Sequence, residues 1–248
     1  MTDDEKLLLR RAEDLAGLAE KYNTPRFSDF FDENEQAVIC GGFYNSGAVW
    51  FGGNIRCTRR MLGIFPDWWC DSYDDEFPIS VLYVKNKGRK ELSHRDYLGA
   101  LMSLGLERKK VGDIAVWHDG AYIFMTPSAA EHASASIGKI ASCGVECTVI
   151  PCSQAKMPEE RFELADIVAA SLRLDAVVAA VCGMSRRVAG EYIAAGRVSV
   201  NHKPEQKCDY LLKEEDLLSL RGYGRVQIIK TGGKTRSDRL HITTKKFI

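Results

Sequence analysis

Residues 78–151 constrain the fold of this chain most, because strand and helix signals follow one another there in a regular order. "ISVLYVKN" alternates as a strand does, and "SHRDYLGALMSLGL" predicts a helix with Ser93 as its N-cap. "DIAVWHDGAYIFMT" predicts two strands joined at Asp119-Gly120, a strong hairpin signal. "PSAAEHASASIGKIAS" predicts a helix with Pro127 in its first turn, and "ECTVIP" predicts a last strand. The order is therefore βαββαβ.

This order is the split-βαβ, or ferredoxin-like, arrangement, which RNA-recognition motifs (RRMs) also use. Those motifs stack bases on aromatic side chains of the sheet, and Tyr122 and Phe124 lie on the predicted hairpin. The dense Arg-Gly-Phe consensus of the motif is missing, however, and aromatic side chains on a sheet more often belong to the core. RNA binding by this RRM-like sheet stays an open alternative.

The predicted fold class is α+β. An α+β lead-in begins with an amphipathic helix over residues 3–22, continues with a second short helix that ends at Gly41-Gly42, and includes a strand in "GAVWFGG". "CDSYDDEFP" is a plausible boundary. We expect four parts along the chain: the lead-in over 1–75, the βαββαβ RRM-like domain over 76–153, a helical linker over 154–171, and a basic domain over 172–248.

Composition excludes several classes of protein. Apolar residues make up 45% of the chain and charged residues 27%, as in ordinary globular proteins. No stretch approaches the ~18 apolar residues of a membrane span, and the charged, helical N-terminus is unlike a signal peptide. We therefore expect a cytoplasmic protein with its eight cysteines reduced. Cys143, Cys147 and Cys152 lie close together, but their spacing fits no zinc motif, so we expect neither a metal nor a cofactor.

Charge is distributed unevenly along the chain, although the net charge is zero. Residues 172–248 hold 15 Lys and Arg against 8 Asp and Glu, a net charge of +7. Residues 1–171 hold 19 against 26, a net charge of −7. This asymmetry indicates either an anion-binding module attached to an acidic body or a solvated surface with local bias.

The stretch "LRLDAVVAAVCGMSRRVAGEYIAAGRVSVNHK" predicts two short helices followed by a strand. Gly183 suits the end of the first helix, Ser185 the N-cap of the second, and Gly196 its end.

Two arginines, Arg186 and Arg187, begin the second of these helices. Their charge opposes the helix dipole at a cost of about 0.3–1 kcal/mol each. A bound phosphate would remove that repulsion, because free backbone N–H groups and guanidinium groups together make an anion site. The alternative is a pair of surface arginines without a ligand.

Residues 172–225 resemble the small RNA-binding domain first described in ribosomal protein S-four. The shared pattern runs through the helix pair and the strands after it: Arg173-Leu174-Asp175, Ser185-Arg186, Ala189, Ile193, Gly196, Val198, Val200-Asn201, Asp216 and "LSLRGYGRVQI". Two positions depart from the pattern. His202 replaces the glycine that usually follows Asn201, and Glu215 replaces the glycine that usually precedes Asp216. Both departures change turns rather than the arginine face, and we expect Glu215 to weaken the local attraction for phosphate.

Most of the chain also resembles the bacterial YlmH-type RNA-binding proteins, through "FSDFFDENEQ", "HRDYLGALMSLGLERKKVGDI" and "RGYGR", whereas residues 42–75 fit less well. The resemblance implies ribosome-associated RNA binding without catalysis. The wider group includes factors that hold peptidyl-tRNA on stalled large subunits during quality control, and a link to cell division is attached to the family. The implied partners are tRNA and the rRNA of the large ribosomal subunit. The implied RNA face consists of Arg173, Ser185, Arg186, Arg187, Tyr192, Arg197, Asn201, Lys203, Arg221 and Arg225.

Two motifs point toward enzymes. "HRD" at residues 94–96 occurs in the kinase catalytic loop, but that loop requires an Asn where this chain has Leu101, so a place at a helix start is favoured. "RLD" occurs in pseudouridine synthases, some of which carry the same RNA-binding domain. Their catalytic motif lies in a large domain after the binding module, and here fewer than 80 residues follow residue 171. We therefore expect no catalytic residues.

The alternative functions are an RNA-modifying enzyme with its chemistry in the βαββαβ unit, a ribosome-assembly factor, and a protein-interaction scaffold built on the acidic N-terminal part. The basic C-terminal segment "KTGGKTRSDRLHITTKKFI" is either a strand extension or a tail that becomes ordered on RNA.

Overall fold

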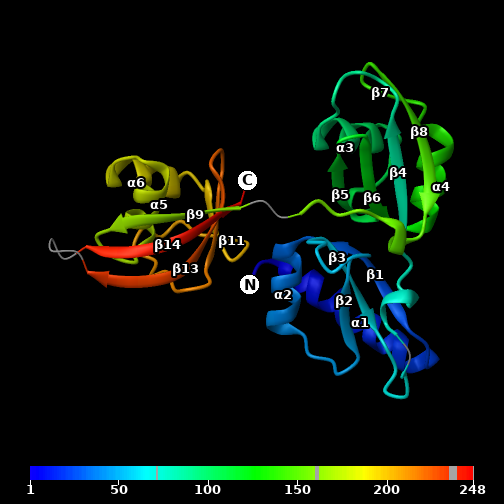
Figure 1. Ribbon diagram of the computed structural model, residues 1–248. Helices are drawn as coiled ribbons and strands as arrows, with labels where there is room; N and C mark the ends of the chain where they lie inside the picture. The colour runs from blue at the N-terminus through cyan, green and yellow to red at the C-terminus, as the bar shows by residue number, and fades with distance from the viewer. Residues whose placement is uncertain (71, 160–161, 235–238, 248) are drawn as a thin grey trace. The chain divides into compact units, whose positions relative to one another are not determined.

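The computed structural model describes residues 1–70, 72–159, 162–234 and 239–247. The chain divides into two compact units, Met1–Pro158 and Glu159–Ile248 (Figure 1). Within the described residues, the first unit holds a three-stranded and a five-stranded sheet, and the second holds one six-stranded sheet.

The first unit begins with the α+β region. Helix α1 (Asp3–Tyr22) starts with a capping box, in which Thr2 and Glu5 each donate a backbone N–H to the side chain of the other. Helices α1 and α2 (Glu33–Gly42) pack against a sheet in the order β1-β3-β2. Its strands are β1 (Arg26–Phe31), β2 (Ala48–Phe51) and β3 (Arg60–Ile64). The two predicted helices and the strand in "GAVWFGG" are confirmed.

The predicted βαββαβ order is also confirmed, except that the second predicted helix ends at Ser136 and its last residues include a short added strand, Lys139–Ile140. The sheet is antiparallel in the order β5-β6-β4-β8-β7, and helices α3 and α4 pack on one face of it. Its elements are β4 (Ser80–Asn86), α3 (His94–Ser103), β5 (Val111–Trp117), β6 (Gly120–Met125), α4 (Pro127–Ser136), β7 (Lys139–Ile140) and β8 (Cys143–Ile150). Short 3-10 helices are η1 (Asp74–Glu76), η2 (Arg108–Lys110) and η3 (Cys152–Gln154).

One local prediction in this domain is shifted by one residue, and another is confirmed. The hairpin of β5 and β6 exists, but Trp117 pairs with Gly120, so its loop is His118-Asp119. A Cβ atom at Gly120 would lie 2.0 Å from the Val84 carbonyl oxygen, so glycine is required there for the close approach of β4. The "HRD" residues begin α3 as expected, and the Asp96 carboxylate accepts the Ser93 N–H at 2.8 Å.

The hairpin aromatics lie on the sheet face opposite the two helices. Tyr122 and Phe124 are buried there, and the Tyr83 ring stacks on Tyr122 with centroids 4.7 Å apart. Residues of the segment after β8, such as Cys152 and Met157, pack over this cluster. These aromatic side chains are therefore part of the core.

Polar contacts join the α+β region to the five-stranded sheet. The Asp113 carboxylate on β5 accepts the backbone N–H groups of Thr58 and Arg59. The Arg59 guanidinium donates to the carbonyl oxygens of Val111 and Phe30. The boundary expected after residue 75 thus lies inside one compact unit.

The second unit is a six-stranded sheet in the order β11-β10-β12-β13-β14-β9, with helices α5 and α6 packed on one face (Figure 1). Its elements are β9 (Phe162–Ala169), α5 (Leu174–Cys182), α6 (Arg186–Ala194), β10 (Val198–Val200), β11 (Lys203–Pro204), β12 (Leu217–Leu220), β13 (Gly224–Lys234) and β14 (Leu240–Phe247). The C-terminal segment forms β14 and the end of β13, so it extends the sheet, and residues 235–238 and 248 of it lie outside the described residues.

The helical linker predicted over residues 154–171 is wrong. Residues 162–169 form the strand β9, which pairs with β14 along its whole length, from Phe162 opposite Phe247 to Ala169 opposite Leu240. "FELADIVA" is rich in helix-forming Glu, Leu and Ala, but the ladder on β14 outweighs that local preference. Residues 160–161 lie outside the described residues.

Candidate nucleic-acid interface

The turn between α5 and α6 determines where the two arginines lie. Gly183 adopts a left-handed conformation with φ 64° at the end of α5, and the Ser185 hydroxyl accepts the Val188 N–H at 3.3 Å as the N-cap of α6. Gly196 ends the second helix with φ 67°. All three predicted helix boundaries are confirmed, and from the start of α6 the Arg186 side chain reaches the first turn of α5.

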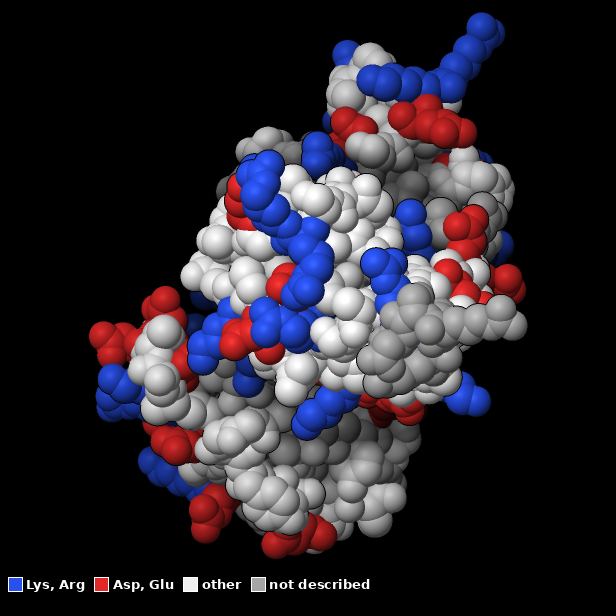
Figure 2. All heavy atoms as spheres, turned by 90° about the vertical axis from the view of Figure 1, so that its left-hand side faces the viewer, with Lys and Arg blue, Asp and Glu red and all other residues white. Residues whose placement is uncertain are grey.

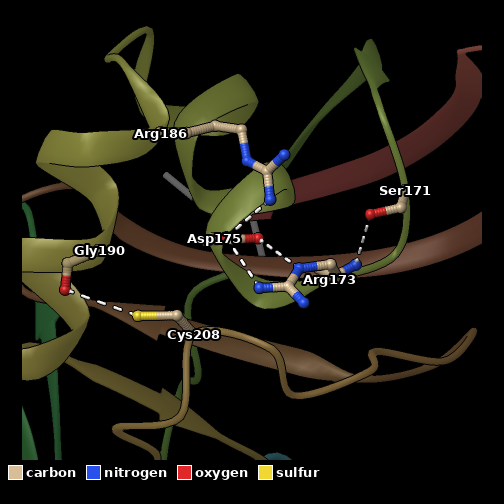
Figure 3. A network of polar contacts seen from close by, with 6 residues as sticks. All are labelled: Ser171, Arg173, Asp175, Arg186, Gly190 and Cys208. Atoms are coloured by element: carbon tan, nitrogen blue, oxygen red, sulfur yellow. Dashed lines mark hydrogen bonds and ion pairs between the residues drawn. The ribbon is translucent and has the colours of Figure 1, made fainter.

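A carboxylate from the first turn of α5 lies between two of the predicted RNA-binding arginines (Figure 3). Asp175 Oδ2 is 2.7 Å from an Nη of Arg186, and the two Asp175 oxygens accept from Nε and Nη of Arg173 at 3.2 Å each. Only 12% of the Asp175 side chain is exposed, whereas 40% of Arg173 and 51% of Arg186 are exposed. The carboxylate therefore holds both guanidinium groups in place and leaves part of each at the surface.

The same contacts set the protonation of this carboxyl group. Burial raises the pKa of Asp175, but the hydrogen bonds from Arg173 and Arg186 outweigh burial, so the pKa lies below its ordinary value. Asp175 is therefore ionised at neutral pH and balances part of the positive charge at the start of α6.

Arg187 has a carboxylate partner of its own. Its guanidinium pairs with Glu191 one turn later on the same helix, and 78% of the Arg187 side chain is exposed. Both arginines that begin α6 are thus paired within the chain. Their placement is tolerated without a bound phosphate, and their exposed nitrogen atoms are still available to one.

A second group of predicted residues lines an open depression of about 420 Å³ at the other end of α6. Arg197, Arg221 and Arg225 lie around it, together with the hydroxyl residues Ser199 and Ser219. Sequence reasoning did not include these two serines, although alternation in "RVSVN" and "LSL" places them on the face opposite the buried valines and leucines.

Tyr192 connects α6 to this second group. Its hydroxyl donates to the Arg221 carbonyl oxygen, and the Arg197 guanidinium lies over its ring, 5.7 Å from the centroid. Tyr192 itself is buried, so it positions the arginines rather than presenting a free ring.

The remaining predicted residues lie on the β10–β11 hairpin. The Asn201 amide donates to Asp216 Oδ1 at 2.7 Å and accepts the Leu217 N–H at 3.0 Å, so this side chain is used inside the domain. Lys203 is exposed on β11. Asn201 and His202 have φ 48° and 67°, and Glu215 has φ 70°, so both residues that replace the usual glycines adopt a conformation that favours glycine.

Lys and Arg side chains also gather in a band across the centre of the view in Figure 2, with a few Asp and Glu side chains against it. This mixture agrees with the pairing of arginines with carboxylates described above. Among the described residues, no group of three or more His, Cys, Asp and Glu side chains is arranged to hold a metal ion.

The cysteines are free thiols in the structure. The clustered Cys143, Cys147 and Cys152 each donate to a backbone carbonyl oxygen, and burial raises the pKa of Cys147 and raises that of Cys152 to about 11. They behave as partly buried core residues. No helix in the described part of the chain is both long and apolar enough to cross a membrane.

Two segments of the chain, one in each compact unit, match known protein families. Residues 73–154 match the family described as "Putative RNA-binding domain in YlmH", and residues 172–218 match the S4 domain. The chain carries a YlmH-type RNA-binding domain followed by an S4 domain. The chain is 29% identical over 246 residues to "Ribosome-associated protein quality control protein P2" of Bacillus subtilis, which covers 98% of this chain and 95% of that protein. It has the fold of the cell division protein ylmH from Streptococcus pneumoniae, with a TM-score of 0.54 and 16% identity over 64% of this chain and 97% of the other.

The S4 match ends at residue 218, so it includes α5, α6 and β10 to the start of β12. Strand β9 lies before the match, and β13 and β14 lie after it. Three of the six described strands of this sheet therefore lie outside the residues matched to the S4 domain.

Proposed function

We propose that this protein is a noncatalytic RNA-binding factor that acts on the ribosome in the cytoplasm, where it contacts rRNA of the large subunit, peptidyl-tRNA or both during quality control of translation or rescue of stalled subunits. The observation that carries the proposal is the alignment of 98% of the chain with a relative whose name is that of a ribosome-associated quality control protein. The S4 domain with its exposed arginines supplies a surface suited to RNA.

The arrangement of the arginines favours binding to the RNA backbone over reading of bases. Arg173, Arg186 and Arg187 present guanidinium nitrogens at one end of the helix pair, and guanidinium groups match phosphate geometry well. Contacts of this kind recognise the shape of folded RNA and depend on salt concentration.

Crosslinking of the protein to RNA in growing bacteria, followed by sequencing of the attached fragments, tests this function. We expect crosslinks concentrated in large-subunit rRNA and tRNA, and we expect them to fall sharply in a chain with Arg186→Ala and Arg187→Ala. Crosslinks spread over small-subunit rRNA precursors would favour ribosome assembly instead. A protein partner that survives nuclease treatment, without RNA crosslinks, would favour the scaffold.

Mapping of rRNA and tRNA modifications by mass spectrometry, with and without the protein, tests the noncatalytic part of the proposal. We expect identical modification maps. A single modification that disappears with the protein would make it an RNA-modifying enzyme.

A further inference from the structure

The face of the six-stranded sheet that points away from α5 and α6 carries a row of aligned side chains. Ser199 lies opposite Ser219, Ser219 opposite Arg225, and Phe247 opposite Phe162. The Arg225 guanidinium lies over the Phe247 ring, 5.1 Å from its centroid, which connects the two halves of the row. We call these five residues the sheet row. It crosses five strands, or about 19 Å at the usual strand spacing.

The neighbours of the row along each strand establish that it faces outward. Val198, Leu218, Val226 and Thr244 alternate with outward-facing positions on β10, β12, β13 and β14, and all four are buried. Since successive side chains of a strand point to opposite faces, the sheet row lies on the face without helices. Phe162, at the β9 end, is 48% exposed.

Cations lie against both aromatic rings of the row. The Lys245 ammonium lies 4.3 Å from the centroid of Phe162 and 4.7 Å from that of Phe247, between two exposed or half-exposed rings. At the other end, Ser199, Ser219 and Arg225 line the depression that Arg197 and Arg221 border. The row therefore joins a pocket of three guanidinium groups to an aromatic surface that carries a further cation.

Two described carboxylates near the row accept hydrogen bonds from neutral side chains. The Asp166 carboxylate on the same face of β9 accepts the Thr243 hydroxyl at 2.7 Å, two positions beyond Leu164 and away from the row. The Glu215 carboxylate accepts the Gln227 side-chain amide at 3.0 Å. The arginines of the depression, the Lys245 ammonium and the two phenylalanine rings make the row suited to an anion that also carries flat apolar groups.

We propose that the sheet row binds a single-stranded segment of RNA, with phosphates at the depression bordered by Arg197, Arg221 and Arg225 and a base stacked on Phe162. Bases stack on exposed aromatic rings only when they are unpaired, and cationic grooves with aromatic side chains bind single strands in this way. This inference rests on the proposed function and adds a second RNA surface, built largely from strands outside the S4 match.

Two probes separate this surface from the helix face. The first is a labelled single-stranded RNA of about 10 nucleotides, and the second is a blunt RNA duplex of the same sequence. We expect Phe162→Leu in the full-length chain to weaken binding of the single strand about tenfold, the size typical of one stacked base, with little effect on the duplex. We expect Phe162→Tyr to restore single-strand binding, because it keeps the ring. Arg186→Ala with Arg187→Ala serves as the reference for duplex binding.

A matched control is Val168→Ala on the same strand, which removes a 39% exposed apolar side chain at the far end of β9 and leaves the ring in place. We expect it to change neither affinity. The sheet-row inference is overturned if the wild-type chain fails to bind the single strand, or if wild type and Phe162→Leu bind it equally well. In either case the proposed function survives if the duplex is bound through Arg186 and Arg187. Failure of the wild type to bind either probe overturns both. If Phe162→Leu instead removes a protein partner and leaves RNA binding unchanged, the row is a protein interface and the inference is wrong.

Discussion

Asp175 explains why two arginines can begin helix α6. Its carboxylate is held between Arg173 and Arg186, and Glu191 pairs with Arg187, so the repulsion between these arginines and the helix dipole is offset inside the domain. We therefore assign Asp175 a positioning role: it orders two guanidinium groups whose exposed nitrogen atoms face solvent.

Replacement of Asp175 by Asn tests this role through its pH dependence. We expect Asp175→Asn to lower the stability of the second unit by about 1–2 kcal/mol at pH 7, because neutral amide contacts replace hydrogen bonds to a charged group. The lowered pKa means that the contribution of the carboxylate is present above the ordinary carboxyl pKa of about 4 and is lost as the pH falls through the lowered value. Urea unfolding followed by circular dichroism should show the difference from wild type at pH 7 and pH 5, and should show it shrinking at more acidic pH. Parallel stability curves over the whole pH range would contradict this role.

Glu215 offers a second test at the scale of one residue. Its φ of 70° costs a residue with a Cβ atom about 1–2 kcal/mol, so we expect Glu215→Gly to raise the stability of the second unit by up to this amount. Glu215→Ala is the matched control, because it removes the same side chain, with its hydrogen bond to Gln227, and keeps the Cβ atom. The difference between Gly and Ala variants in denaturant unfolding measures the strain. Equal stability of the two variants would mean that the positive φ of Glu215 carries no strain.

Among the elements, those with strong local signals agree with the sequence analysis, and β9 does not. Helix caps such as Ser93 and Ser185, and the alternation in β4, are local properties that a sequence displays directly. In β9 the local residues favour a helix, and the deciding interaction is with β14, more than 70 residues later in the chain. A pattern read within residues 162–169 therefore does not predict the pairing of β9 with β14.

A proline within β9 tests whether this edge strand belongs to the folded domain. Ile167 packs against the core of the second unit, and we expect Ile167→Pro to lower the stability of that unit by about 0.5–3 kcal/mol, because it removes the isoleucine side chain and disturbs the pairing with β14. Hydrogen exchange measured by mass spectrometry should show faster exchange in β14 and unchanged exchange in β4 and β6. Ile167→Val, which removes one methylene group, should leave β14 protected. Unchanged protection of β14 in the proline variant would mean that β9 contributes little.

At the scale of the whole molecule, the two compact units are expected to unfold in separate transitions. All four tryptophans, at positions 50, 68, 69 and 117, lie in the first unit, so their fluorescence reports that unit alone. We expect Asp113→Ala to lower the stability of the first unit by about 2–3 kcal/mol, since two backbone N–H groups are left without a charged acceptor. Calorimetry should then show one transition shifted and the other in place. A single transition that moves as a whole would contradict the division into two units.

The sequence was sufficient to predict which arginines lie at the surface, but not which contacts hold them there. The RNA-face residues derived from resemblance include seven that lie around the helix pair or the depression with part of the side chain exposed, whereas Asn201 and Tyr192 are engaged inside the domain. Asp175 was visible within "RLD", but its role depends on the contact of its carboxylate with Arg186 of the next helix. The sheet row depends on strand register across five strands, which sequence pattern alone does not supply.

The salt dependence of RNA binding is the most direct test of the central claim that the S4 domain binds the RNA backbone through its arginines. The full-length chain and the Arg186→Ala, Arg187→Ala variant are titrated onto one structured large-subunit rRNA fragment at several salt concentrations. We expect the variant to bind more weakly and its log–log salt slope to be smaller by up to about 1.8, or 0.9 for each phosphate that an arginine neutralises. Glu191→Ala, which frees Arg187 from its carboxylate, should bind at least as tightly as wild type. An unchanged affinity and an unchanged slope in the double variant would contradict the claim.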